Sequence, residues 1–324
     1  CNKVGGIYTV LSTQAKTLQT AMPDRIIYFG PYFDTKSAKI DFIKDDSIHP
    51  EWKSAADEAG IPIYIGRWKA PGSPIAVLVD STPLMTHRDI IYSKMWKDFQ
   101  VDSLHAYGDY HDASMFAYAV GKVCETIAKK CLPAESKVLL QAHEWMSGFA
   151  LLYVKKHCPE MATVFTTHAT SIGRSITSNN KPLYDYFENY FGDQMASELH
   201  MEAKHSVEKC AAQNADCMTT VSEVTDVECC QFLERKSDVI LPNGFDMSIV
   251  PTKSVAARKR KAARLKLFDI AHCLTGKEYP DDTLVVTSSG RNDFRCKGFD
   301  IFFSTLKRLQ ENKDLKRDIL AVIA

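Results

Sequence analysis

Strand-like apolar segments alternate with segments of helical period along most of the chain, and this alternation constrains the fold more than any other feature. Early strands are expected at residues 26–30, 61–66 and 75–80, and a helix is expected at 110–131, ending before Pro133. Strands that alternate with helices build parallel sheets with crossover helices, which predicts an α/β fold. A chain of 324 residues exceeds what one hydrophobic core usually serves, so we expect two domains.

Four further strands follow in succession, and polar or glycine residues come after each of them. The pairs are 137–141 with His143-Glu144, 162–166 with Thr167-His168, 217–221 with Ser222-Glu223, and 239–241 with Asn243-Gly244. In doubly wound sheets, ligands bind outside the carboxyl ends of the strands. We therefore expect these groups to converge on one crevice.

The polar groups after the first two of these strands suit a sugar phosphate. The Glu144 carboxylate can accept hydrogen bonds from sugar hydroxyls, and His143 can orient them. His168 offers a polar contact to a transferred sugar, and Arg174 offers a cation to its phosphates. The alternatives are an acid and a histidine satisfied by loop backbone, and a core histidine at 168.

Two glycine-containing segments are candidate anion sites. Gly5 and Gly6 precede a helical pattern, so backbone N–H groups there could approach a diphosphate while Lys3 supplies a charge. Asn243 and Gly244 could bind a hydroxyl or a phosphate through the amide and the exposed backbone. An ordinary Gly-Gly turn and an ordinary Asn-Gly turn are the alternatives.

Residues 290–300 give the sharpest functional pattern. A strand ending near Gly290 delivers Arg291, and Lys297 follows just before a helix expected at 299–310. Two cations and a helix N-terminus would stabilise the charge that develops on a diphosphate leaving group without a metal. The chain contains no Asp-X-Asp triplet at a strand end and no carboxylate cluster typical of a metal-dependent transferase.

Composition excludes several classes of protein. The 40 basic residues balance 40 acidic ones, so no net charge favours nucleic acid or a membrane surface. Apolar runs such as 75–79 are far shorter than the roughly 18 residues of a spanning helix. The ten cysteines show no zinc spacing. The basic run at 258–261 is interpreted as a solvated helix face. We expect a cytoplasmic protein whose two ends are truncated.

Six motifs, taken in chain order, resemble glycogen synthases of the animal and fungal type. They are Asn2 to Val10, His143-Glu144-Trp145, Phe165 to Thr170, Thr219 to Ser222, Pro242-Asn243-Gly244, and Gly290 to Asp300. The resemblance implies a GT-B fold, in which two Rossmann-like domains face a cleft. Residues 1–250 would form the acceptor-side domain. Residues 251–324 would form a linker and the start of a nucleotide-binding domain, which is incomplete.

The resemblance also implies an activity and a set of roles. Glucose would pass from UDP-glucose to an α-glucan, with retention and an α-1,4 bond, without metal or cofactor, in a protein that is a homo-oligomer when complete. His168 and Glu144 would be catalytic. The substrate-binding residues would be Lys3, Gly5, Gly6, His143, Arg174, Asn243, Gly244, Arg291 and Lys297.

Departures from the family pattern limit these expectations. The family's paired glutamates would fall beyond Ala324, so we expect this chain alone to be inactive. Asn292-Asp293 replaces the usual Tyr-Glu, and the helix that binds glucose-6-phosphate would also lie downstream. Another GT-B enzyme using ADP-glucose, a sucrose or trehalose-phosphate synthase, and a non-catalytic glucan-binding relative remain alternatives.

Overall fold

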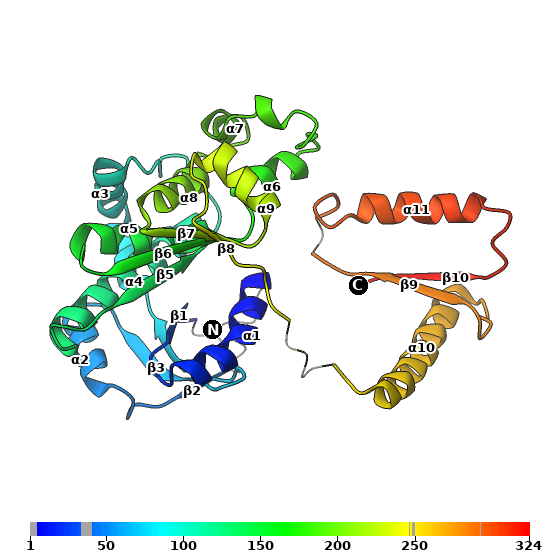
Figure 1. Cartoon of the computed structure of the whole chain (residues 1–324), viewed down its shortest axis with the longest axis horizontal. Coiled ribbons are helices and arrows are strands. Elements are labelled where there is room, and N and C mark those ends of the chain that lie inside the picture. The colour runs from blue at the N-terminus through cyan, green and yellow to red at the C-terminus, as the bar shows by residue number, and fades with distance from the viewer. Residues whose placement is uncertain (1–4, 34–40, 246, 248–249, 292) are drawn as a thin grey trace. The chain divides into compact units, whose positions relative to one another are not determined.

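A computed structural model describes the chain except for residues 1–4, 34–40, 246, 248–249 and 292 (Figure 1). The chain forms two compact units. The first comprises Cys1–Ile176 and Pro182–Phe245, and the second comprises Thr177–Lys181 and Asp246–Ala324. The assignment of acceptor-side and nucleotide-binding roles to 1–250 and 251–324 stays a prediction.

The first sheet of the first unit is mixed. Its strands are β1 (Ile27–Pro31), β2 (Phe42–Lys44), β3 (Ile63–Trp68) and β4 (Ile75–Val79), in the order β1-β4-β3-β2. Only β1 and β4 pair in parallel, whereas β3 is antiparallel to both β2 and β4. The expectation of parallel strands is wrong here, because the short loop of residues 69–74 between β3 and β4 is too brief for a crossover.

The second sheet confirms the expected parallel arrangement. Its strands are β5 (Leu139–His143), β6 (Ala162–Thr167), β7 (Cys217–Thr220) and β8 (Val239–Ile240), and they pair in this order, all in parallel. Their carboxyl ends therefore lie along one edge of the sheet. His143 pairs with Thr166 at that edge.

Helices pack on both sheets of the first unit and share one core with them. Residues of β3 and β4, of α4 and α5, and of β5 to β7 belong to the same buried apolar cluster. The predicted helix at 110–131 is confirmed as α4. The helices are α1 (Gly5–Ala21), α2 (Pro50–Glu58), α3 (Arg88–Phe99), α4 (Tyr110–Cys131), α5 (Gly148–His157), α6 (Ser171–Ser178), α7 (Gly192–Glu198), α8 (Glu202–Asn214) and α9 (Glu223–Glu228). Short turns are η1 (Thr82–His87), η2 (Trp145–Ser147), η3 (Phe187–Asn189) and η4 (Cys229–Leu233).

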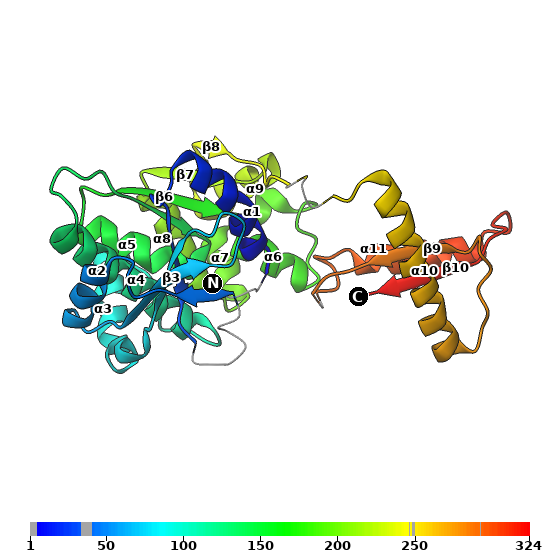
Figure 2. The same ribbon diagram turned by 90° about the horizontal axis from the view of Figure 1, so that it is seen from below.

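The second unit contains a parallel strand pair between two helices. Its elements are α10 (Lys253–Thr275), β9 (Leu284–Ser288), α11 (Phe299–Glu311) and β10 (Ile319–Ile323). Figures 1 and 2 show α10 and α11 on opposite faces of the β9–β10 pair. The strand expected before Gly290 and the helix expected at 299–310 are confirmed as β9 and α11. The basic run 258–261 is exposed on α10, as expected of a solvated face. None of the helices in the described part of the chain is long and apolar enough to span a membrane.

Candidate functional site

The carboxyl edge of the second sheet brings two histidines into contact. His143 ends β5, and His168 follows β6 directly. The Nδ1 atom of His143 lies 3.1 Å from Nε2 of His168, so one ring donates a hydrogen bond that the other accepts. Burial, and then the charge of His168, lowers the pKa of His143 to about 4, and burial also lowers the pKa of His168. Both rings are therefore neutral at pH 7, and the hydrogen bond links their tautomers, because one of the two facing nitrogens carries the proton and the other does not.

Glu144 occupies a strained backbone position beside this pair. Its φ of 62° and ψ of 169° belong to a region that is populated almost only by glycine. Its N–H donates to the carbonyl of Thr166 (2.9 Å), and its Oε1 accepts from the N–H of His168 (2.9 Å). The side chain is 6% exposed, and burial raises its pKa, opposed by that N–H and by the charge of Arg174. Glu144 thus fixes the backbone at His168, which agrees with the interpretation of an acid satisfied by loop backbone.

Hydrogen bonds of buried side-chain hydroxyls join the strands of the second sheet near this edge. Gln141 Nε2 donates to Thr166 Oγ1 at 2.9 Å, and Thr166 Oγ1 lies 2.8 Å from Thr219 Oγ1. Thr220 Oγ1 donates to the carbonyl of Thr167 at 3.0 Å. These contacts tie β5, β6 and β7 together at the level of the histidines. The Thr167 hydroxyl is the exception at this level, because it is buried and has no hydrogen-bond partner among the described residues.

Helix α6 presents Arg174 to the surface. Ile172 and Ile176 are fully buried in a small apolar cluster with Phe232, whereas Arg174 is exposed. The spacing i, i+4 of the two isoleucines places them on one face of the helix. The charge of Arg174 reaches Glu144, where it favours the ionised carboxylate. Arg174 therefore lies close enough to Glu144 for their charges to interact, and its role in binding a ligand stays a prediction.

Two buried acids, Glu208 and Glu228, hold the start of α6. Glu208 Oε2 accepts from the N–H (2.9 Å) and the hydroxyl (2.5 Å) of Ser171. Glu228 Oε2 accepts from Thr170 Oγ1 at 2.6 Å, and its Oε1 accepts from the hydroxyl of Tyr184 at 2.8 Å. Burial, and then the charge of Glu144, raises the pKa of Glu208 to about 8. Neither Glu208 nor Glu228 is among the site residues predicted from the sequence.

The other ligand-binding residues predicted in the first unit are not brought into contact with one another in the described part of the chain. Asn243 and Gly244 follow β8, are exposed, and lie outside any regular element. A Cβ at Gly244 would meet nothing within 4 Å, so the backbone does not require glycine there. Gly5 begins α1 and Gly6 lies in its first turn beside open space, which confirms the expected helix start. Lys3 lies outside the described residues. The anion-binding roles of these positions stay predictions.

In the second unit, Arg291 and Lys297 flank one turn after β9. A Cβ on Gly290 would lie 3.2 Å from the Cγ and Cδ atoms of Lys297, so the lysine stem packs against this glycine. The N–H of Asp293 donates to the carbonyl of Arg291 (2.6 Å), and the N–H of Lys297 donates to the carbonyl of Asp293 (3.0 Å). Helix α11 begins at Phe299, directly after Gly298 at φ 68°. Both exposed side chains therefore belong to the turn that precedes α11, and their role in holding a diphosphate stays a prediction.

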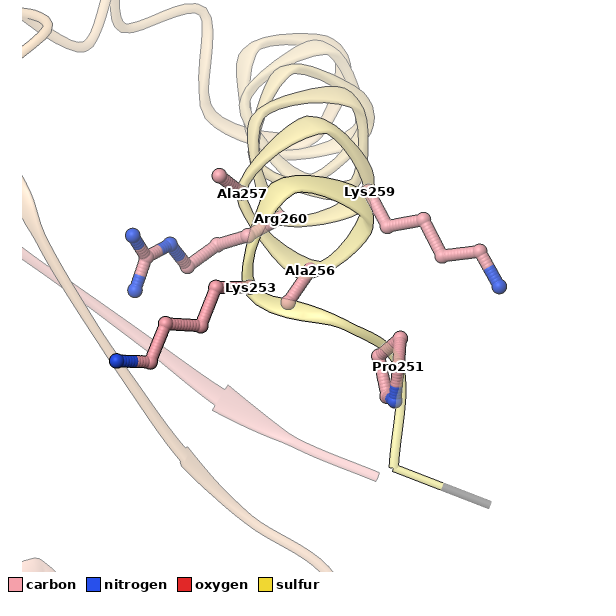
Figure 3. Close-up of a pocket in the computed structure, with 6 residues that line it drawn as sticks. All are labelled: Pro251, Lys253, Ala256, Ala257, Lys259 and Arg260. Atoms are coloured by element: carbon pink, nitrogen blue, oxygen red, sulfur yellow. The ribbon is translucent and has the colours of Figure 1, made fainter. Parts of the chain in front are cut away.

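A shallow pocket lies along the first turns of α10 and is lined by residues of that helix and by Pro251. Figure 3 shows its cationic side chains, Lys253, Lys259 and Arg260, extending from the helix around Ala256 and Ala257. Among the residues that the structure describes, no three His, Cys, Asp or Glu side chains gather in a way that could hold a metal ion.

Comparison with known proteins shows a close relationship to one family. Residues 1–324 match the model of the family described as glycogen synthase. A glycogen [starch] synthase of Neurospora crassa is 29% identical over 314 residues, and the human liver glycogen [starch] synthase is 30% identical over 317 residues. The Caenorhabditis elegans glycogen [starch] synthase is 28% identical over 319 residues. Each match covers 95% of this chain but only 44%, 44% and 47% of the relative.

Proposed function

The chain belongs to the glycogen synthase family, and from that premise we propose that it is part of a retaining glucosyltransferase. The enzyme transfers glucose from UDP-glucose to the non-reducing end of an α-1,4-glucan. The observation that carries the proposal is the family match over residues 1–324, joined to the gathering of His143, Glu144, His168 and Arg174 at one sheet edge. Parallel sheets bind their ligands at this edge.

His168 and Arg174 are proposed to bind the donor from the first unit. A neutral imidazole can donate one hydrogen bond to a sugar hydroxyl, provided its other nitrogen accepts from His143. The Nδ1–Nε2 contact between the two rings supports this arrangement. Arg174 supplies a cation for the donor phosphates. Glu144 is proposed to act near the glucosyl unit and to hold the backbone of His168 in place.

Arg291 and Lys297 are proposed to hold the diphosphate that leaves during transfer. Negative charge grows on this group as the bond to glucose breaks, and fixed cations stabilise it more in that state than before. The exposed turn after β9, with the stem of Lys297 packed on Gly290, supports this role. Lys3, Gly5, Gly6, Asn243 and Gly244 are proposed to add further donor contacts. Transfer is proposed to need no metal and no cofactor.

The architecture we propose is GT-B, with an acceptor-side domain at 1–250 and the start of a nucleotide-binding domain at 251–324. The chain spans about 44% of the length of the human and Neurospora relatives. We therefore propose that transfer requires the complete protein. We also propose that the complete protein forms a homo-oligomer and that it acts in the cytoplasm on glycogen.

The test uses the longest protein that the gene encodes, with glycogen as acceptor. Radiolabelled UDP-glucose and ADP-glucose are compared as donors, and EDTA is added to one series. We expect incorporation from UDP-glucose at least about ten-fold faster than from ADP-glucose, corresponding to 1.4 kcal/mol of preference, unchanged by EDTA. Digestion by an α-1,4-specific glucosidase should release the label. A preference for ADP-glucose would overturn the choice of donor, and glucan binding without transfer would overturn the enzyme.

A further inference from the structure

Three carboxyl groups from separate parts of the fold contact the short segment 168–174. Glu144, after β5, accepts from the N–H of His168. Glu208, on α8, accepts from the N–H and hydroxyl of Ser171. Glu228, on α9, accepts from the hydroxyl of Thr170. This segment carries His168 at one end and Arg174 at the other, so the position of both depends on these three carboxyls.

Glu208 binds the first turn of α6 from inside the protein. Its side chain is fully buried, with 0% exposure. Its Oε2 accepts both hydrogen bonds of Ser171, while no partner of Oε1 is found among the described residues. Burying a carboxyl group is costly unless its hydrogen bonds are made. An apolar residue at this position would avoid the free-energy cost of burying a carboxyl group, but it could not hold the start of α6 by hydrogen bonds.

Glu228 contacts the residue directly before the same turn. Its Oε2 accepts from Thr170 Oγ1, which itself accepts from the N–H of Gly173 at 3.1 Å. A Cβ on Gly173 would lie 2.5 Å from Glu228 Oε2 and 2.6 Å from Thr170 Oγ1. Real Cβ atoms do not approach other atoms this closely, so only glycine permits the contact. Tyr184 donates to the second oxygen of Glu228 and fixes its orientation.

Charge explains why a neutral Glu208 suits this place. Burial and the negative charge of Glu144 both favour its protonated form, and the hydrogen bonds from Ser171, followed by the charge of Arg174, only partly oppose them. Two nearby buried carboxyls do not both ionise readily. A protonated Glu208 contacts the backbone of α6 without adding negative charge beside Arg174, which leaves the local potential suited to an anionic ligand.

We propose that Glu208 and Glu228 are positioning residues of the donor site, which hold His168 and Arg174 in the geometry that binds a sugar nucleotide. The inference rests on the proposed function for its ligand. Its structural part, the ordering of residues 168–174, is independent of that function. Neither acid is proposed to touch the substrate.

The test combines kinetics with hydrogen exchange on the longest protein that the gene encodes. Glu208→Ala and Glu228→Ala are expected to raise KM for UDP-glucose by about ten-fold or more, because buried hydrogen bonds to Ser171 and Thr170 are lost and their donors are left unpaired. Amide exchange in a peptide covering 168–176 should accelerate by a similar factor. Glu208→Gln keeps an acceptor for Ser171 and should restore both values to within about two-fold of wild type.

Glu125→Ala is the matched control. Glu125 also accepts from a tyrosine hydroxyl, that of Tyr153 at 2.5 Å, but it lies on α4, where its other partner is Lys129. It should leave both readouts unchanged. Wild-type KM and exchange in both alanine variants, or equal changes in Glu125→Ala, would overturn the inference. Should an alanine variant fail to fold, Glu208→Asp and Glu228→Asp replace it, with the same expected direction. If the wild type transfers no glucose, the proposed function fails and the exchange rates alone decide the inference.

Discussion

Replacing Glu208 by Gln should change how the stability of the protein depends on pH. Burial, then the charge of Glu144, raises the pKa of Glu208 from 4.5 to about 8. Between these values the native state keeps a proton that the unfolded chain has released. Wild-type stability therefore falls as pH rises from about 4.5 to about 8. Glutamine cannot ionise, so this part of the pH dependence should disappear.

The expected magnitude follows from one proton. A difference of one bound proton changes the free energy of unfolding by about 1.4 kcal/mol per pH unit. Because Glu144 and Glu208 interact, the proton belongs partly to the pair, and we expect a slope of about 1 kcal/mol per pH unit. Relative to wild type, Glu208→Gln should gain stability steadily from pH 5 to pH 8. The difference should be constant above pH 8.

Urea unfolding at pH 5 to 9, followed by tryptophan fluorescence, measures this difference. The tryptophans all lie in the first unit, at positions 52, 68, 96 and 145. Asp216→Asn is the control, since Lys155 and Thr163 lower the pKa of Asp216 from 3.8 to about 2. Its stabilising effect is present above pH 3.8 and is lost as pH falls through about 2, so that variant should show no trend from pH 5 to 9. A constant difference between Glu208→Gln and wild type across this range would refute the reasoning.

Three further predictions concern other residues of the two units. Gly173→Ala should destabilise the chain by about 1–3 kcal/mol, because a carboxylate oxygen would lie 2.5 Å from the new Cβ. Gly6→Ala should instead stabilise it by about 0.5–1 kcal/mol, because the new Cβ would meet nothing within 4 Å. Urea unfolding measures both, and a stabilising Gly173→Ala would contradict the packing. Arg291→Ala and Lys297→Ala should each slow glucosyl transfer by about 10² in the complete protein, as loss of one transition-state contact does; near-normal rates in both would place the diphosphate elsewhere. Burial holds the pKa of His143 near 4, so ¹⁵N chemical shifts should show a neutral imidazole at pH 5.5, and a charged ring at that pH would be the contrary result.

The parallel sheet could be predicted from sequence because its strands are short apolar runs followed at once by polar groups. In a parallel sheet every carboxyl end lies at one edge, so sequence order alone predicts that His143 and His168 approach each other. The 3.1 Å contact between their rings confirms this. The first sheet could not be predicted in the same way. There, the hairpin between β3 and β4 depends on the length of one loop, residues 69–74, rather than on the pattern within the strands.

The acids behind the site escaped the sequence interpretation because a helix that contains an acid usually turns it to solvent. On α8, however, Glu208 falls among Ala203, Val207, Ala211 and Ala212, which form the buried face. The helical periodicity therefore contained the necessary information, since an acid on an apolar face is buried unless the helix rotates.

Helix α9 departs more strongly from the usual burial of apolar residues, because its valines are exposed and its polar residues are buried. This inversion indicates a functional requirement rather than a contribution to stability. Val224 and Val227 are 57% and 54% exposed, whereas Thr225, Asp226 and Glu228 are buried. A sequence shaped by stability alone would place the valines inside, because each buried valine contributes about 1.5–3 kcal/mol. Of these buried polar residues, Glu228 contacts Thr170 in the segment that carries His168 and Arg174, whereas Asp226 accepts from the N–H and hydroxyl of Ser237. Local conflicts between pattern and burial are expected where a site has requirements that packing does not. The inversion on α9 and the acid on α8 meet at the same turn of α6, which is the turn that the proposed donor site needs to be rigid.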